Sequence, residues 1–218
     1  MSRTKGRHHL ICLLFAVAGV PACSTSPSPP PGSTPSPPAG TAPGAPAKQA
    51  SPPDVAFMTG MIHHHAQALV MAKLADTHAA NPSIKVLSER ITVSQTDEIR
   101  MMQQWLRENG AEAPEPSPTG QRMQMGGVTH DMLMPGMLTE EQMTQLERAR
   151  GAEFDRLFLT FMIQHHEGAL TMVDQLFASH GGGVDDFIYK IASDTFADQG
   201  SEIDRMQRML DAMASGGR

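Results

Sequence analysis

One pattern rich in histidine and methionine occurs twice in this chain. MIHHHAQALVMA begins at Met61, and MIQHHEGALTMV begins at Met162. A shift of 101 positions superposes the two copies, and Gln164 then stands where the first copy has His63. Imidazole nitrogen and thioether sulfur, in the absence of thiolate, suit Cu(I) and tolerate Ag(I) better than they suit zinc, iron or manganese. The repeated pattern therefore predicts a copper-binding protein.

A second part of each repeat carries an acidic residue. QTDEIRMMQQWL begins at Gln95 and matches QGSEIDRMQRML after a shift of 104 positions, which pairs Glu98 with Glu202. Both glutamates interrupt an apolar helical stripe, where an ionised carboxylate without a partner is unfavourable. We expect each to hold a histidine of the neighbouring helix, or to bind the metal itself.

The helical period places the ligand residues on one face. At about 100° per residue, His64 and His65 flank Met61, and the small Ala68 leaves space beside them. His63 leaves this face by roughly 160°, so we expect it to point outward without a role in the site. The predicted core ligands are Met61, His64, His65, Met162, His165 and His166, supported by Met102 and Met206. The alternative is that these side chains are buried for packing alone.

The connection between the repeats, Pro114 to Met143, is rich in methionine as well. Its methionines have no helical periodicity, and methionine close to water favours metal capture over packing. The candidate ligands of this capture arm are Met123, Met125, His130, Met132, Met134 and Met137. A hydrophobic lid or a patch for a partner protein is the alternative.

Four segments have helical periodicity. They are Asp54 to His78, Pro82 to Asn109, Thr139 to Ser179 and Val184 to Ala214. Strands are not expected, and Gly151 marks a place where the third segment is kinked or begins anew. Two similar hairpins joined by a crossover predict an all-α fold, an antiparallel four-helix bundle with the two histidine faces turned toward a shared core.

The first residues have the character of an export signal. A basic start is followed by a short apolar run, Leu10 to Val20, and VPAC ends at Cys23 in the manner of a lipobox. We expect a signal peptide over residues 1–22, a Pro/Ser/Gly-rich tether over 23–53, and one domain over 54–218. Simple cleavage near Ala22 without lipidation is the alternative. The only other cysteine, Cys12, lies inside the signal, so the mature domain has no disulfide, thiolate metal site or cysteine nucleophile.

Charge excludes one class of partner. Without residues 1–22 the chain keeps fourteen basic residues against twenty-three acidic ones, a net charge of −9. Such a surface argues against nucleic acid. The expected partners are the metal ion, the membrane through the lipid anchor, and a copper-transfer protein or a second copy of the chain.

The spaced motifs also resemble a known family. DVAFMTGMIHHHAQALVMA, EFDRLFLTFMIQHHEGALTMV, MPGMLTEEQM and the two EIxxM elements are similar to the family of domain of unknown function 305. The resemblance implies a ferritin-like helical bundle, an exported location and copper binding linked to copper tolerance. We therefore predict an extracytoplasmic Cu(I)-binding protein, at the outer face of the cell membrane or in the periplasm, that buffers, stores or transfers copper. A metal-dependent redox or hydrolytic enzyme using Glu98 or Glu202, and a haem-binding or structural bundle, are the alternatives.

Overall fold

The computed structural model describes residues 50–216, a mostly helical chain with one small sheet. The elements, in chain order, are α1 (Pro52–His78), α2 (Pro82–Glu108), β1 (Gln121–Met125), β2 (Val128–Met132), α3 (Glu140–Arg148), α4 (Gly151–Ala178) and α5 (Asp186–Gly216). The predicted signal peptide, the lipobox and nearly all of the predicted tether lie outside the described residues. No described helix is long and apolar enough to cross a membrane.

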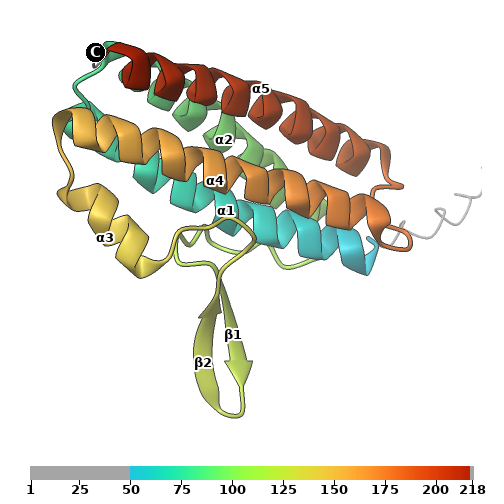
Figure 1. The fold of residues 1–218 in the computed structure, drawn as a ribbon. Coiled ribbons are helices and arrows are strands. Elements are labelled where there is room, and N and C mark those ends of the chain that lie inside the picture. The colour runs from blue at the N-terminus through green and yellow to red at the C-terminus, as the bar shows by residue number, and fades with distance from the viewer. Residues whose placement is uncertain (1–49, 217–218) are drawn as a thin grey trace, which may run out of the picture. The chain divides into compact units, whose positions relative to one another are not determined.

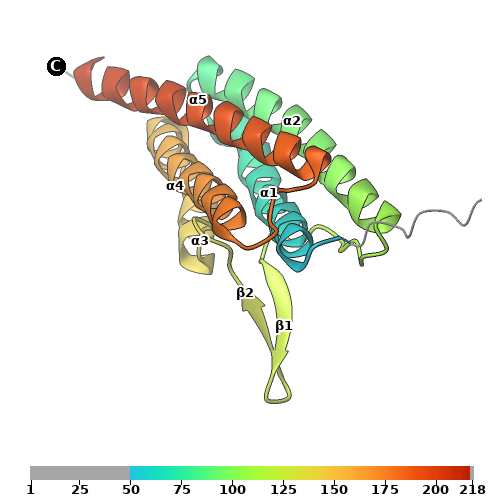
Figure 2. The ribbon, with the colours of Figure 1, turned by 90° about the vertical axis from the view of Figure 1, so that its right-hand side faces the viewer.

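The repeated segments form two helical hairpins. α1 packs along α2, and α4 packs along α5, while the two histidine-bearing helices, α1 and α4, pack against each other (Figure 1). Figure 2, turned by 90°, shows the same four long helices with the β-hairpin projecting from them. α1 begins at Pro52, earlier than predicted, because Ser51 caps the helix and proline suits its first turn.

Two buried aspartates connect the hairpins reciprocally. Asp54 in α1 accepts a hydrogen bond of 2.7 Å from the N–H of Gly183, in the turn between α4 and α5. Its repeat equivalent, Asp155 in α4, accepts from the N–H groups of Ala80 (3.1 Å) and Asn81 (2.9 Å), in the turn between α1 and α2. Each hairpin therefore holds the turn of the other through the same residue of the repeat.

The prediction that the chain has no strands is wrong. β1 and β2 form an antiparallel hairpin in which Gln121 pairs with Met132 and Met123 pairs with His130. Gly126 and Gly127 form the turn with positive φ angles of 60° and 81°, which suits a tight hairpin connection. The Met123-x-Met125 spacing, for which we noted only the lack of helical periodicity, has the period of two that is typical of a strand.

The predicted third helix is divided in two at the expected glycine. Ala149 and Arg150 are extended, and Gly151 has φ 61° where α4 begins. Thr139 and Gln142 form a reciprocal capping box at the start of α3. The separate amphipathic stretch that we considered before Gly151 is therefore a helix of its own.

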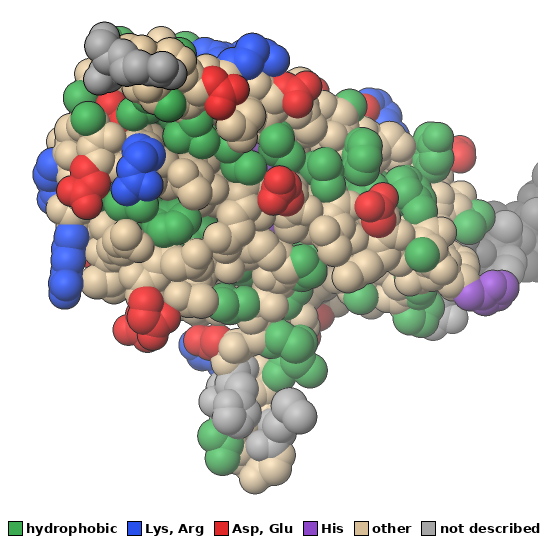
Figure 3. All heavy atoms as spheres, in the orientation of Figure 1, with side chains coloured by type: hydrophobic (Ala, Val, Ile, Leu, Met, Phe, Trp, Pro, Cys, Tyr) green, Lys and Arg blue, Asp and Glu red, His purple; other side chains and the backbone are tan. Residues whose placement is uncertain are grey.

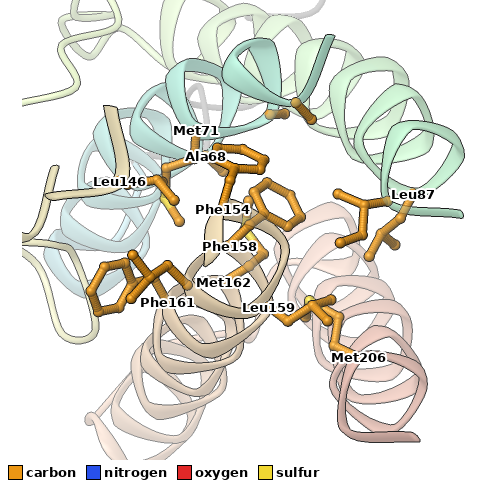
Figure 4. Packing of buried hydrophobic residues seen from close by; sticks show 14 of the residues in the cluster. Ala68, Met71, Leu87, Leu146, Phe154, Phe158, Leu159, Phe161, Met162 and Met206 are labelled. Carbon is orange, nitrogen blue, oxygen red and sulfur yellow. The ribbon is translucent and has the colours of Figure 1, made fainter. Parts of the chain in front are cut away.

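The core consists of two apolar clusters with a polar layer between them. One cluster contains Phe154 and Phe158, which pack between the long helices (Figure 4), and the other contains Phe57 and Trp105. Along each long helix, residues of one cluster precede the polar layer and residues of the other follow it. The polar positions are the repeated histidines on α1 and α4, and the Gln/Glu pairs on α2 and α5.

Candidate metal centre

The two histidine helices bring one imidazole from each repeat into direct contact. The rings of His64 and His165 lie 3.8 Å apart between centroids with their planes 37° apart. His65 and His166 flank this pair, and all four side chains are fully buried. The structure thus places the four predicted histidines together in one layer of the core.

Each outer imidazole contacts a carboxylate of the neighbouring helix. His65 Nε2 lies 2.6 Å from Glu98 Oε2, and His166 Nε2 lies 2.8 Å from Glu202 Oε2. A carboxylate accepts, so Nε2 carries the proton in each pair, and Nδ1 is left with a free lone pair when the ring is neutral. This agrees with the expectation that Glu98 and Glu202 hold histidines, and it is the arrangement that orients metal-binding histidines.

The inner pair offers further free nitrogens. His64 Nε2 donates to the carbonyl oxygen of Pro135 at 3.1 Å, which leaves Nδ1 free by the same reasoning. Both ring nitrogens of His165, and Nδ1 of the other three histidines, are buried without a hydrogen-bond partner among the described residues. A buried polar atom without a partner costs about 1–3 kcal/mol. A metal ion that accepts these lone pairs would remove that cost, so the residues fit a metal.

Burial also favours the neutral form of the two inner imidazoles, His64 and His165. Desolvation lowers the pKa of His64 well below its usual range, and the charges of His65 and His166 lower it further. Desolvation does the same to the pKa of His165, with smaller effects from the other three histidines. Both rings are therefore neutral near pH 7, the form that binds metal.

Buried methionines accompany the histidines. Met61 and Met162 lie one helical turn before the stacked rings, and Met102 and Met206 lie one turn after the two glutamates. No group of three or more His, Cys, Asp and Glu side chains within residues 50–216 could hold a metal ion by itself. Imidazole and thioether are the donors that these buried histidines and methionines offer, and this pair favours a soft ion.

His63, which we expected to point outward, does not reach solvent. Its side chain is only 5% exposed, and its Nδ1 accepts a hydrogen bond of 3.1 Å from the N–H of Ser117. Burial lowers the pKa of His63, an effect that the Ser117 contact opposes. The helical wheel placed His63 away from the other histidines, but the chain between α2 and β1 covers that outer face.

The predicted capture arm divides into two parts. Met123 and Met132 lie on the hairpin and are 37% and 45% exposed; Figure 3 shows hydrophobic side chains on this projection. Met137 is buried, and its sulfur accepts a hydrogen bond from the N–H of Met134, so its predicted place near water is wrong. The side chains of Met125 and His130 lie outside the part of the structure described.

Residues 134–138, which we call the strap, cross the outer side of α1 and α4. The Gln67 amide donates to the carbonyl oxygen of Leu138 and accepts from its N–H group. On α4, a Cβ at Gly168 would stand 2.0 Å from the carbonyl oxygen of Pro135. Our sequence analysis missed Gln67, although it follows His63 by one helical turn and so lies on the face that the crossover covers.

Known proteins share the sequence motifs and the fold of this chain. A family model described as "Domain of unknown function (DUF305)" matches residues 54–210. The chain belongs to the DUF305 family. This confirms the resemblance inferred from the repeated motifs. No curated protein matches the chain.

Three solved structures share the fold. A DUF305 fragment from Deinococcus radiodurans is 26% identical, with a TM-score of 0.61, over 75% of this chain and 99% of the fragment. CopM in the Cu(I)-bound form is 25% identical, with a TM-score of 0.56, over 75% of this chain and 98% of CopM. A DUF305 protein from Streptomyces coelicolor is 23% identical, with a TM-score of 0.62, over 74% of this chain and 94% of that one. CopM has also been solved in Cu(II)-bound and Ag-bound forms.

Proposed function

We propose that this DUF305 protein binds Cu(I) outside the cytoplasm and buffers, stores or transfers the ion. The observation that carries the proposal is the buried pair His64 and His165 with its unpartnered nitrogens, in a cysteine-free domain whose core also buries Met61 and Met162. The similarity of this chain to CopM, which has been solved with Cu(I), Cu(II) and Ag bound, supports copper as the metal and Ag(I) as a substitute.

The proposed core ligands are drawn from both repeats. His64 and His165 supply imidazole nitrogen, and Met61 and Met162 supply sulfur, from helices that pack together. Met102 and Met206 are additional sulfur donors in the same core, and Glu98 and Glu202 keep the outer imidazoles in the orientation described above. The whole would be a ferritin-like antiparallel four-helix bundle with a soft-metal site in its polar layer.

Location is part of the proposal. The apolar run Leu10–Val20 and the VPAC sequence support export and lipidation of Cys23, with the domain tethered to the outer face of the membrane or free in the periplasm. The folded domain offers copper thioether and imidazole ligands, and it has no cysteine thiolate that would compete with them. A transfer partner or a second copy of the chain would receive the ion.

Titration under anaerobic conditions tests the function. Copper(I) is added to the purified full-length chain in the presence of a coloured Cu(I) chelator, and the amount removed from the chelator is measured. We expect His64→Ala with His165→Ala to lose the tightest site. His180→Ala removes an exposed histidine in the turn after α4 and should keep that site. Equal competition by Zn(II) and Cu(I) for the wild-type site would contradict the proposal.

A further inference from the structure

The polar layer reaches solvent along one side of the helices. α1 packs closely along α2, α4 along α5 and α1 along α4, whereas α2 and α5 are not closely packed along their lengths. Leu87 of α2 and Met206 of α5 extend into the interior between the helices at one end of this seam (Figure 4). The α2–α5 seam is therefore closed by side chains rather than by close helix packing.

Two carboxylates connect solvent with the buried imidazoles at this seam. The side chains of Glu98 and Glu202 are 16% and 12% exposed, yet each contacts a fully buried ring, of His65 and His166 respectively. Asp198 lies beside them on the surface of α5. Burial raises the pKa of Asp198, the charges of Glu98, Asp194 and Glu202 raise it further, and the charge of Arg90 opposes them.

Two buried amides lie one helical turn along α2 and α5 from the glutamates. Gln95 and Gln199 occupy equivalent repeat positions, three residues before the two glutamates, and are 2% and 3% exposed. Neither the oxygen nor the nitrogen of either amide has a hydrogen-bond partner in the part of the chain that the structure describes. Four such atoms at symmetric positions are a large unfavourable term for a core that serves packing alone.

The opposite side of the histidine layer is sealed by the strap. The backbone of the strap contacts α4 at Gly168 so closely that a single added Cβ would collide with it. Gln67 fixes the strap with two hydrogen bonds to Leu138 (2.6 and 3.0 Å), and His64 binds Pro135. An ion that entered here would have to break this set of contacts.

We propose that copper enters and leaves the histidine pair through the α2–α5 seam, past the Glu98 and Glu202 carboxylates and then the Gln95 and Gln199 amides. This inference rests on the proposed function and assigns the route to its site. The carboxylates attract the cation at the surface, and the amide oxygens solvate it in the core, where a bare ion would be strongly disfavoured. The unpartnered amides are thus explained as transient ligands on the route.

The test separates route from affinity. Stopped-flow transfer of Cu(I) from a coloured chelator to the purified full-length chain gives the loading rate, and equilibrium competition gives the affinity. In Gln95→Leu with Gln199→Leu we expect loading to slow by about tenfold, which corresponds to a barrier higher by about 1.4 kcal/mol. Affinity and thermal stability should be retained, because removing a buried amide that lacks a partner does not break a hydrogen bond.

Matched variants complete the design. Gln207→Leu, on the exposed face of α5, controls for the substitution, and Glu89→Gln, exposed on α2, controls for Glu98→Gln with Glu202→Gln. Glu98→Gln with Glu202→Gln removes charge at the seam and should weaken the dependence of the loading rate on salt concentration. Glu89→Gln should leave this dependence unchanged.

Different results would overturn the proposed entry route and the proposed function. Wild-type loading rates in the Gln95→Leu/Gln199→Leu variant overturn the route, as does a Gln67→Leu variant that alone accelerates loading by loosening the strap. A wild-type chain that binds no Cu(I) at equilibrium overturns the proposed function instead.

Discussion

At the scale of single residues, the hydrogen bonds of the histidines determine which ring nitrogen is free. Glu98, Glu202 and the Pro135 carbonyl each accept a hydrogen bond from an Nε2 atom, of His65, His166 and His64 respectively. In each of these rings Nδ1 is the nitrogen left to donate a lone pair when the ring is neutral. Within residues 50–216 the ring of His165 has no such partner, and its nearest aromatic neighbour is the tilted ring of His64, 3.8 Å away between centroids. The chemistry of the site therefore depends on which side of each ring its neighbours contact.

The lowered pKa values of His64 and His165 predict that the metal-free protein becomes less stable as pH falls. Near pH 7 both rings are neutral in the folded and the unfolded chain. As pH falls below the unfolded pKa of about 6.5, the unfolded chain takes up protons that the folded core refuses. Each such histidine contributes a loss of up to about 1.4 kcal/mol per pH unit in the free energy of unfolding.

Denaturant unfolding between pH 7 and pH 5, with a copper chelator present, measures this dependence. His64→Leu with His165→Leu should have a shallower slope than the wild type. Identical slopes in the two proteins would show that these rings are not the source of the acid sensitivity.

At the scale of elements, two positions at which the repeats differ, 63/164 and 67/168, contact the crossover in both repeats. Gln67 in α1 holds the strap by its amide, and its repeat equivalent in α4 is Gly168, which lets the strap backbone approach. His63 accepts from Ser117, whereas its equivalent, Gln164, donates to the Gly136 carbonyl. The loss of the third histidine in the second repeat is therefore explained by a different contact with the same crossover.

Gly168 should be among the least tolerant positions of the helices. In Gly168→Ala the added Cβ would stand 2.0 Å from the Pro135 carbonyl oxygen, so we expect a loss of stability of roughly 1–3 kcal/mol from overpacking. Gly200→Ala, in the interior of α5 with nothing within 4 Å of the added Cβ, should instead gain about 0.5–1 kcal/mol from helix propensity. Thermal unfolding of the two variants checks the pair, and a loss of similar size in both would contradict the strap contact.

The exposed methionines of the hairpin give a second prediction at this scale. Met123→Leu with Met132→Leu keeps apolar bulk and removes sulfur, so copper stoichiometry or uptake rate should fall while the fold is retained. As both side chains are partly exposed, stability should change by no more than roughly 0.5 kcal/mol for each. Unchanged copper uptake with a large drop in melting temperature would show that the pair serves packing.

At the scale of the whole domain, the two hairpins hold each other through equivalent aspartates. Asp54 binds the α4–α5 turn and Asp155 binds the α1–α2 turn, and both carboxylates are buried. Because α1 and α4 carry the stacked imidazoles, this reciprocal connection also sets the positions of the helices that form the candidate metal centre.

Asp155→Ala removes the carboxylate that accepts hydrogen bonds from the N–H groups of Ala80 and Asn81, so both groups lose their acceptor. We expect a loss of roughly 3 kcal/mol or more in the free energy of unfolding, since such bonds are worth about 1.5–3 kcal/mol each. Asp174→Ala, at an exposed position of the same helix, serves as the control. If both changes have the same small effect, the turn is held by packing alone.

The sequence by itself determined the repeat, the helical hairpins, the family and the place of four histidines on the buried faces of their helices, because helical periodicity and spaced motifs are local properties of the chain. The partnership of Glu98 and Glu202 with histidines also followed, since a carboxylate on a core face requires a partner. Only the tertiary structure decided the stacking of His64 on His165, the burial of His63 and Met137, and the strap against Gly168. These depend on where a Pro/Gly-containing connection folds back over the helices, and no local periodicity records that path. The hairpin was the exception, since its period of two was present in the Met-x-Met spacing.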